Sequence, residues 1–384
     1  MSWLTSEQAL ALLGTKSQTL YANVSRGRIR AKPDPADSRR SLYHGEDVER
    51  LASRHAGRRK AEAVAAQTIR WGDPVLPSAI STIIDGRLFY CGSDAAILAE
   101  EATLEEIAAL LWGGDAPISI TDRTEDRPAA LSLEAGFVTL ARRANMDLPS
   151  LGRASSALLP EAESVLMTLA DALTPPVCGC ALHERLAKGW GRPEANDCIR
   201  SALVLLADHE LNASTFAARV TASTGATLSA AVLSGLATLT GPLHGGAWQG
   251  VQALIETARS IGAAQAVRRC LAQGTPLSAV GHRLYPDGDI RAVALMSRFT
   301  LPPIFAEVRN AAEDMVGEKV NIDFALAAMT ATFNLPEHAP LIIFALARSV
   351  GWLAHAMEQA ESGELIRPRA RYVGRAPAVG SRDE

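Results

Sequence analysis

Three short stretches of the chain hold the residue types that proton-transfer chemistry needs. They read Gly-Pro-Leu-His244-Gly-Gly, Gly-His282-Arg-Leu-Tyr and Asn-Ile-Asp323-Phe. Two imidazoles and one carboxylate suit a condensation on a carbonyl substrate, in which one proton is taken, one is given and charge is held on oxygen in between. Each group also has an ordinary explanation: His244 could be a loop residue among glycines, and Asp323 could cap the Ala-rich helix predicted after it.

A fourth candidate comes from helix periodicity. Leu341, Phe344 and Ala345 define an apolar stripe, and Arg348 falls on the same face, which Trp352 continues. A guanidinium there must meet an anion, because an unpaired buried charge is severely unfavourable. An internal salt bridge or a substrate carboxylate would each satisfy it.

Helices must position these groups. A capping box, Thr103-Leu-Glu-Glu106, starts one helix, and helical spacing of apolar residues recurs at 161–173, 195–206, 251–261 and 341–356. The sequence has no run of alternating strands, no glycine fingerprint for nucleotides and no internal repeat. The body of the chain is therefore predicted to be all-α.

Composition bounds the class of protein. At 384 residues, with 48% hydrophobic and 21% charged residues, the chain is globular and long enough for two or three domains. The start of the chain shows no secretory leader pattern, so we expect a cytoplasmic location. Val220 to Leu239 is uncharged, but its seven Ser or Thr residues favour a buried helix over a membrane span.

The five cysteines lack the paired spacing of a metal site. We expect reduced thiols, no bound metal and no membrane association.

The first 60 residues form a basic head, with 12 Lys or Arg against 6 Asp or Glu, whereas the rest has 26 against 36. A short helix from Trp3 with a Thr-x-x-Gln capping box, a second from Ser17 to near Gly27 and a third at 46–51 are predicted. The cations lie mostly between the last two helices, at Arg26, Arg28, Arg30, Lys32, Arg39 and Arg40. We place a domain at 1–60, a linker at 61–77 and the body at 78–384.

The head, and in particular Ser41-Leu-Tyr43 leading into Glu46-Asp-Val48, resembles the winged helix-turn-helix of the MerR and excisionase families. That resemblance implies DNA binding through residues 1–60. The alternative is a docking module whose arginines form a solvated face.

The body resembles citrate synthases. The three motifs above carry the resemblance, together with residues 81–92, the Leu-Trp112-Gly-Gly stretch, Ala-Asp-His209-Glu and Tyr372-Val-Gly, so it covers most of 78–374. It implies a large helical domain holding both ends of the body and a smaller domain, roughly 246–334, that closes over the substrate.

The resemblance also implies roles for the chemical groups. His244, oriented by Ser214, would stabilise the enol of an acyl-CoA, Asp323 would remove its proton, and His282 would polarise the ketone of a 2-oxo acid. The substrate contacts it implies are His209, Arg291, Phe344, Arg348 and Arg367. No cofactor is implied beyond the acyl-CoA substrate.

Two of these residues need a further remark. Arg367 matches an arginine that the family inserts into the neighbouring subunit's site, which implies a homodimer with shared active sites. Arg291 could instead form a surface ion pair with Asp289.

The sequence departs from the family pattern at the lining of the site. Trp248 replaces an Asn, Ile290 a Pro, Cys91 an Arg and Leu206 a His, and Asp-Phe-Tyr-Ser-Gly becomes Asp323-Phe-Ala-Leu-Ala. These changes leave all proposed catalytic groups in place and leave open which 2-oxo acid is used.

The sequence thus favours condensation of acetyl-CoA with oxaloacetate. A close variant would use propionyl-CoA and make 2-methylcitrate. A different class, a non-catalytic DNA-binding regulator that senses a carboxylate or acyl-CoA, would need the arginines but has no use for a positioned base.

Overall fold

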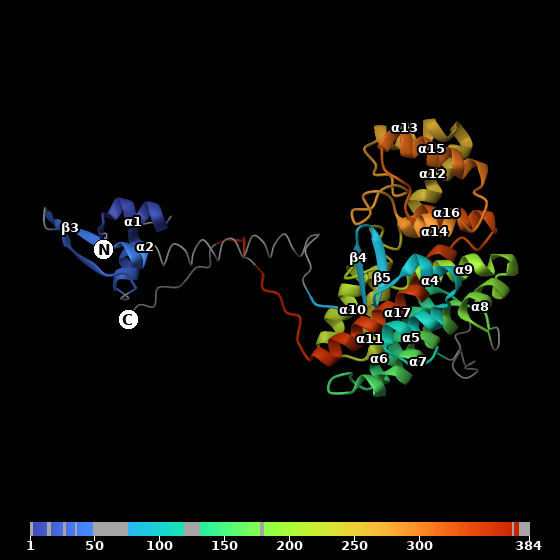
Figure 1. Ribbon diagram of the computed structural model, residues 1–384, viewed down its shortest axis with the longest axis horizontal. Coiled ribbons are helices and arrows are strands. Elements are labelled where there is room, and N and C mark those ends of the chain that lie inside the picture. The colour runs from blue at the N-terminus through green and yellow to red at the C-terminus, as the bar shows by residue number, and fades with distance from the viewer. Residues whose placement is uncertain are drawn as a thin grey trace. The chain divides into compact units, whose positions relative to one another are not determined.

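A computed structural model describes residues 3–13, 17–25, 28–34, 37–48, 76–118, 131–176, 180–370 and 372–375. The chain divides into two compact units, Met1–Pro77 and Ser78–Glu384 (Figure 1). Each unit is described by itself below.

The first unit combines two helices with a small antiparallel sheet. Its elements are β1 (Trp3–Leu4), α1 (Ser6–Leu13), α2 (Ser17–Ser25), β2 (Ala31–Asp34) and β3 (Asp37–His44), with strand order β1-β3-β2. The predicted capping box is present: the Thr5 amide donates to Gln8 Oε1 (3.0 Å), and the Gln8 amide donates to Thr5 Oγ1 (3.3 Å).

The first unit differs from the prediction at its start. The helix expected from Trp3 begins at Ser6, because residues 3 and 4 pair with Tyr43 and His44 of β3. Residues 45–48 are helical, as predicted for the third helix, and the remainder of that helix and most of the linker 61–77 lie outside the described residues.

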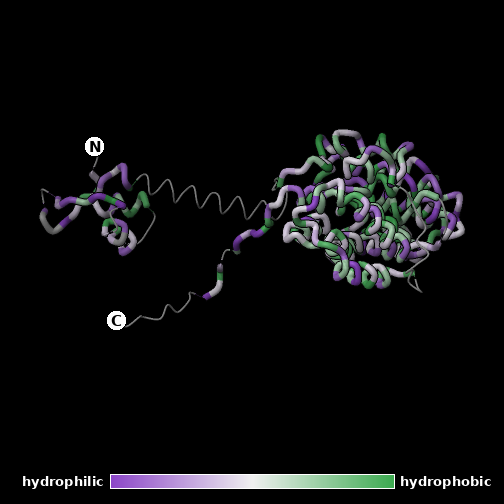
Figure 2. Tube along the Cα trace, turned by 90° about the horizontal axis from the view of Figure 1, so that it is seen from below, coloured by the Kyte–Doolittle hydropathy of each residue, from purple (hydrophilic) through white to green (hydrophobic). Residues whose placement is uncertain are grey.

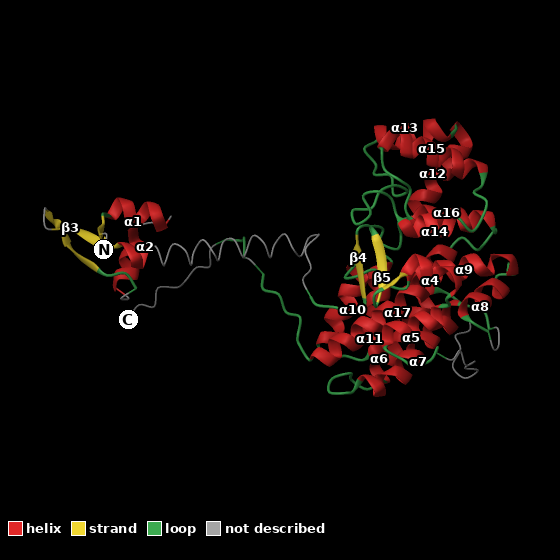
Figure 3. Cartoon of the chain, in the orientation of Figure 1, coloured by secondary structure: helices red, strands yellow, loops and turns green. Residues whose placement is uncertain are grey.

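The second unit is built mainly of helices (Figure 3). Those before residue 240 are α4 (Ala95–Glu101), α5 (Leu104–Trp112), α6 (Leu133–Met146), α7 (Ser155–Leu173), α8 (Leu182–Gly189), the 3-10 helix η1 (Pro193–Ala195), α9 (Asn196–Leu206), α10 (Ala213–Ser223) and α11 (Leu228–Leu239). Those after it are α12 (Trp248–Ile261), α13 (Ala263–Ala272), α14 (Ile290–Met296), α15 (Pro303–Val316), α16 (Ile322–Thr332) and α17 (Ala339–Ser362). The predicted capping box at Thr103 and the helices around 161–173, 195–206, 251–261 and 341–356 are confirmed.

The all-α prediction is wrong for one segment. Strands β4 (Ser81–Ile84), β5 (Arg87–Tyr90) and β6 (Ser93–Asp94) form an antiparallel sheet in that order. Asp85 and Gly86 join the first two strands with φ of 51° and 70°. An Asp-Gly pair between two β-branched or aromatic runs is a hairpin signal, so the sequence itself carried the information.

At Val220–Leu239 the structure has helix, as predicted, but not one continuous helix. That stretch is divided between the end of α10 and α11, with a turn at Gly225 (φ 80°) between them. Among the described residues, α17 alone is long and apolar enough to cross a membrane, and 89% of its most apolar window is buried inside the fold. It is therefore the central helix of the larger core.

Two hydrophobic cores lie in the second unit. The larger one surrounds α17, whose Trp352 is fully buried. The smaller one extends from Val251 to Ala328 and is formed by α12, α13, α15 and α16, whereas α14 packs into the larger core. Figure 1 shows α12, α13 and α15 grouped at one end of this unit, next to α14 and α16. Hydrophobic and hydrophilic segments alternate along the helices (Figure 2), as amphipathic packing requires.

Candidate active site

His244 lies in the turn between α11 and α12. Its Nε2 is 2.8 Å from the Ser214 hydroxyl, which is also 2.8 Å from Asn212 Oδ1 and accepts a hydrogen bond from Trp352 Nε1 (3.1 Å). Asn212 caps α10 and accepts from the Ser214 and Thr215 amides. Asn212, the N-cap of α10, therefore fixes the position of Ser214, and Ser214 in turn contacts His244.

His244 is neutral at physiological pH. Burial, followed by the charge of Arg348, lowers its pKa to about 4. Its ring meets Phe344 edge to face, with centroids 5.8 Å apart. A neutral imidazole donates from one nitrogen and accepts at the other, which is what enol stabilisation needs.

His282 follows Gly281 (φ 77°) in the loop before α14. The Leu284 amide donates to His282 Nδ1 at 3.2 Å, so the ring proton is on Nε2. Burial, followed by the nearby Arg291 charge, lowers the pKa of His282 to about 4. His282 is thus a neutral donor through Nε2.

Asp323 is the second residue of α16. The cap of this helix is Asn321, whose Oδ1 accepts from the Phe324 amide (3.3 Å), so capping is not the role of Asp323. Asp323 Oδ1 is buried without a hydrogen-bond partner among the described residues. Burial raises the pKa of this carboxyl to about 7. A carboxylate with a raised pKa and a free oxygen is suited to act as a base.

Backbone pairing brings His282 and Asp323 together. Val280 and Val320 form an antiparallel bridge, and the Gly281 amide donates to the Lys319 carbonyl (2.9 Å). The Asn321 side chain adds a bond from Nδ2 to the Ser278 carbonyl (2.8 Å). The residues just before each catalytic candidate are therefore fixed to one another.

Arg291 pairs with Asp289, as the alternative interpretation expected, but not at the surface. Both side chains are buried, and Nε and Nη2 of Arg291 bond the carboxylate at 2.9 and 2.8 Å. Burial works against the charge on Arg291, but the charge of Asp289, its hydrogen bonds and the nearby Tyr285 together outweigh burial and raise the pKa of the guanidinium.

Arg348 is 1% exposed and has no ion pair within 4 Å in the part of the chain that the structure describes. Its Nε donates to the Leu206 carbonyl (2.9 Å), and its guanidinium lies 4.9 Å from the Phe344 ring centroid. Burial lowers its pKa to about 10, so it remains charged at neutral pH. The internal salt bridge that could have satisfied it is absent from the described residues.

His209 is the common neighbour of these groups. Its Nε2 is 2.8 Å from the Tyr285 hydroxyl, and its ring centroid is 5.2 Å from that of His282. Burial and then the charges of Arg291 and Arg348, with smaller effects of the two other histidines, lower its pKa well below the ordinary value. His244, His282, Arg291 and Arg348 therefore all lie near enough to His209 to affect its pKa.

Arg367 is not part of this cluster. It is exposed in the segment that follows α17 and leads away from the helices of the body (Figure 1). The sequence prediction for Arg367 concerned a neighbouring subunit, and it stays a prediction.

Three residues at the site were missed as functional candidates from sequence. Asn212 accepts a hydrogen bond from Ser214, and the Tyr285 hydroxyl contacts His209. Asp208 precedes His209 in the chain and accepts hydrogen bonds from Ser81 and His355. The His355 Nδ1 atom faces the Arg219 guanidinium (3.2 Å), which can only donate, so the His355 proton points to Asp208. The only signal for Asn212, Tyr285 and Asp208 in the sequence was that each lies within three residues of a predicted site residue.

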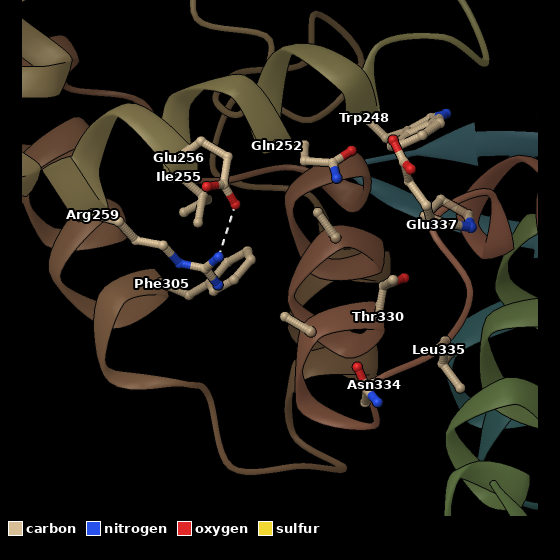
Figure 4. Close-up of a pocket in the computed structure, with 13 residues that line it drawn as sticks. Trp248, Gln252, Ile255, Glu256, Arg259, Phe305, Thr330, Asn334, Leu335 and Glu337 are labelled. Atoms are coloured by element: carbon tan, nitrogen blue, oxygen red, sulfur yellow. Dashed lines mark hydrogen bonds and ion pairs between the residues drawn. The ribbon is translucent and has the colours of Figure 1, made fainter.

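A separate cavity of about 260 Å³ lies between α12, α15, α16 and the start of α17 (Figure 4). Trp248 lines it, with Gln252, Glu256, Thr330 and Glu337 among others, and none of the predicted site residues does. Among the described residues, no group of three or more His, Cys, Asp or Glu side chains could hold a metal ion.

Residues 167–369 match the family model described as citrate synthase, C-terminal domain. The citrate synthase of Haloferax volcanii is 33% identical over 341 residues, covering 75% of this chain and 90% of that protein. Citrate synthase 2 of Bacillus subtilis is 30% identical, covering 77% and 93%.

The chain belongs to the citrate synthase family.

The fold agrees with this membership. A crystal structure of citrate synthase from Thermotoga maritima has a TM-score of 0.64 at 26% identity, covering 82% of this chain and 98% of that one. All nine predicted site residues lie within the segment that matches the family model, whereas the first 77 residues lie outside it. The family model thus concerns the helical body and does not test the predictions for residues 1–60.

Proposed function

We propose that this protein condenses acetyl-CoA with oxaloacetate and water to give citrate and CoA. The observation that carries the proposal is the Asp323 carboxyl, whose Oδ1 is buried without a hydrogen-bond partner among the described residues and whose pKa is raised to about 7 by burial. His244 and His282 supply neutral imidazoles. A sensor of carboxylates has no need for such a base. Family membership supports the same reaction class.

In the first step, Asp323 takes a proton from the methyl group of the acetyl thioester. The C–H electron pair becomes the C=C bond of the enol, and the thioester oxygen gains the negative charge. When the Ser214 hydroxyl turns its proton from Asn212 Oδ1 to His244 Nε2, the His244 proton is left on Nδ1 to bond that oxygen.

In the second step, the enol carbon attacks the ketone carbon of oxaloacetate and forms the new C–C bond. The ketone oxygen takes up a proton from His282 Nε2 and becomes a hydroxyl. Water then cleaves the thioester. Its oxygen joins the new carboxylate, one of its protons goes to the CoA sulfur and the other restores His282, and Asp323 releases its proton to solvent.

The carboxylates of the 2-oxo acid bind to the guanidiniums. Arg348 has donors to spare, because Nε alone is used in a hydrogen bond among the described residues. Arg291 is held on one edge by Asp289 and retains Nη1. His209, a neutral ring fixed by Tyr285, adds a third polar contact.

We further propose a homodimer in which Arg367 enters the partner subunit's site. Support comes from an exposed apolar surface on α6 and the loop after it, where Met146, Leu148 and Leu151 are 77%, 68% and 65% exposed. Large exposed apolar side chains in one region are typical of a protein interface. The exposed position of Arg367 in a single chain fits the same proposal.

A role in DNA binding is proposed for residues 1–60. Two helices followed by the β2–β3 hairpin have the element order of a winged helix-turn-helix, and Arg28, Arg30, Lys32 and Arg40 are exposed on this unit. A gel shift with mixed duplex DNA tests it, and retention must weaken steeply with salt. Absence of any salt-sensitive retention would remove the proposal.

We also propose a cytoplasmic location. Cys91, Cys198 and Cys270 form no disulfide among the described residues, which fits a reducing compartment.

The decisive experiment measures release of free CoA thiol from acetyl-CoA and propionyl-CoA across a panel of 2-oxo acids. The proposed function predicts release with acetyl-CoA and oxaloacetate. Faster release with propionyl-CoA would instead identify a 2-methylcitrate synthase. No release with any acceptor, combined with a higher melting temperature in citrate or CoA, would support a ligand sensor.

A further inference from the structure

The Asp289 carboxylate contacts two elements of the site at once. Its Oδ1 accepts from the amide and the Nε of Arg291 at 3.1 and 2.9 Å. Its Oδ2 accepts from Arg291 Nη2 at 2.8 Å and from the Ile322 amide at 3.0 Å. All four bonds are buried, and the residue is 2% exposed.

These four bonds connect groups that are far apart in the chain. Arg291 is the second residue of α14, and its guanidinium is the proposed carboxylate ligand. Ile322 is the first residue of α16, and the next residue is the proposed base, Asp323. The Asp289 carboxylate therefore bonds both to Arg291, the proposed ligand of the 2-oxo acid, and to the first turn of α16, which contains the proposed base Asp323.

A simple helix cap would not need this arrangement. Capping α14 uses only the bond from the Arg291 amide to Oδ1, and α16 already has Asn321 as its cap. The remaining three bonds fix a side chain and a second helix. A buried carboxylate is tolerated here because Arg291 neutralises it and every bond to it is short.

We propose that Asp289 is a positioning residue that sets the location of the Asp323 base relative to the carboxylate-binding guanidinium of Arg291. This inference rests on the proposed condensation function. It assigns Asp289 no contact with substrate.

The charges around Asp323 supply a signature that a purely structural role would lack. After burial, the charges that act on the Asp323 carboxyl are Arg291, which lowers its pKa, and Asp289, which raises it. Arg348 of α17 acts instead on His244 and Asp208, and the charged Glu256 and Arg259 of α12 pair with each other at the surface. Removing the Asp289 charge must therefore lower the pKa of Asp323.

The test compares Asp289→Asn with Asp287→Asn, an exposed carboxylate two residues earlier in the same loop. For Asp289→Asn we expect KM for the 2-oxo acid to rise and kcat to fall, each by roughly tenfold or more, since charged hydrogen bonds to Arg291 are lost. The acid limb of the kcat profile must also move to lower pH. Asp287→Asn must leave all three quantities unchanged.

A second pair of variants separates the effect of the Ile322 amide bond from the effect of the Arg291 bonds. Ile322→Pro removes the amide that bonds Asp289 and leaves the Arg291 pair, and proline is tolerated at the first helical position after an extended residue such as Asn321 (φ −108°, ψ −178°). Ile322→Ala controls for the lost side chain. The inference predicts a lower kcat for the proline variant than for the alanine variant, at similar KM for the 2-oxo acid.

The outcomes distinguish this inference from the proposed function. Absence of thiol release by the wild type would overturn the function, and the inference would then be tested by the ¹³C carboxyl titration of aspartate-labelled protein, with the Asp323 signal assigned from Asp323→Asn. An unchanged Asp323 titration and an unchanged acid limb in Asp289→Asn would overturn the inference. Should that variant fail to fold, equal kcat values for the two Ile322 variants would overturn it.

Discussion

The Ser214 hydroxyl lies 2.8 Å from His244 Nε2 and at the same distance from Asn212 Oδ1. A hydroxyl has one proton, so only one of these acceptors receives it at a time. The proposed mechanism uses the state in which the proton goes to His244, because the opposite nitrogen then carries the proton that meets the thioester oxygen. In the proposed mechanism the tautomer of His244 thus depends on Ser214.

Ser214→Ala should lower turnover by about tenfold, because His244 loses the bond that selects its tautomer. Stability should also fall, since the buried Trp352 Nε1 loses its acceptor. The control is Ser229→Ala, another buried serine, which pairs with Thr227 instead. Steady-state thiol release and thermal unfolding measure the two effects, and equal turnover in both variants would contradict the assigned role.

Asp323→Asn should lower turnover by roughly two to four orders of magnitude, the usual contribution of a positioned proton-transfer group. The same variant should melt at a higher temperature than the wild type at pH 8. A carboxyl whose pKa is raised in the folded state to about 7 favours folding less as pH rises from its unfolded value through 7, and asparagine removes that penalty. The gain in melting temperature should shrink at pH 5, where the wild-type carboxyl is protonated.

The pH profile of kcat should show one acid limb near pH 7. The base must be ionised, so activity falls as pH drops through the Asp323 pKa of about 7. Both histidines have pKa values lowered to about 4, so they stay neutral over this range and add no limb. Thiol release between pH 5 and 9 measures the profile, and a limb that persists unchanged in a residual-activity profile of Asp323→Glu would assign it to another group.

Arg348→Gln should raise KM for the 2-oxo acid by roughly ten- to hundredfold through loss of a charged hydrogen bond to substrate. The matched control is Arg185→Gln, because Arg185 is equally buried but bonds Asp171 at 2.8 Å. That control should lose stability and keep its KM, since the buried Asp171 carboxylate loses the charge of Arg185. A KM for Arg348→Gln within twofold of wild type would exclude a role in carboxylate binding.

Gly235→Ala should destabilise the body by about 1–2 kcal/mol despite the better helix propensity of alanine. A Cβ at this position of α11 would lie 2.6–3.0 Å from the rigid indole of Trp352. Gly136→Ala in α6 is the control, since its nearest neighbour is a flexible Leu169 methyl at 3.2 Å. Chemical denaturation should rank Gly235→Ala as the less stable of the two variants.

Local signals in the sequence predicted the elements well where a side chain caps its own helix. The Thr5 and Thr103 capping boxes and the long apolar period of α17 depend only on residues three or four apart, so the sequence contains the whole interaction. The β4–β5 hairpin was missed although its Asp85-Gly86 turn was visible, because the helical periods around it were given more weight.

Composition and motif wording predicted, without coordinates, a helical body with His244, His282 and Asp323 as its reactive groups. Tertiary structure decided the protonation and charge states of these groups. The neutral imidazoles, the raised pKa of the Asp323 carboxyl and the charge of Arg348, which has no ion pair among the described residues, all depend on how much water and which charges surround each group. Those surroundings come from segments far apart along the chain, and spacing in the sequence carries no information about them.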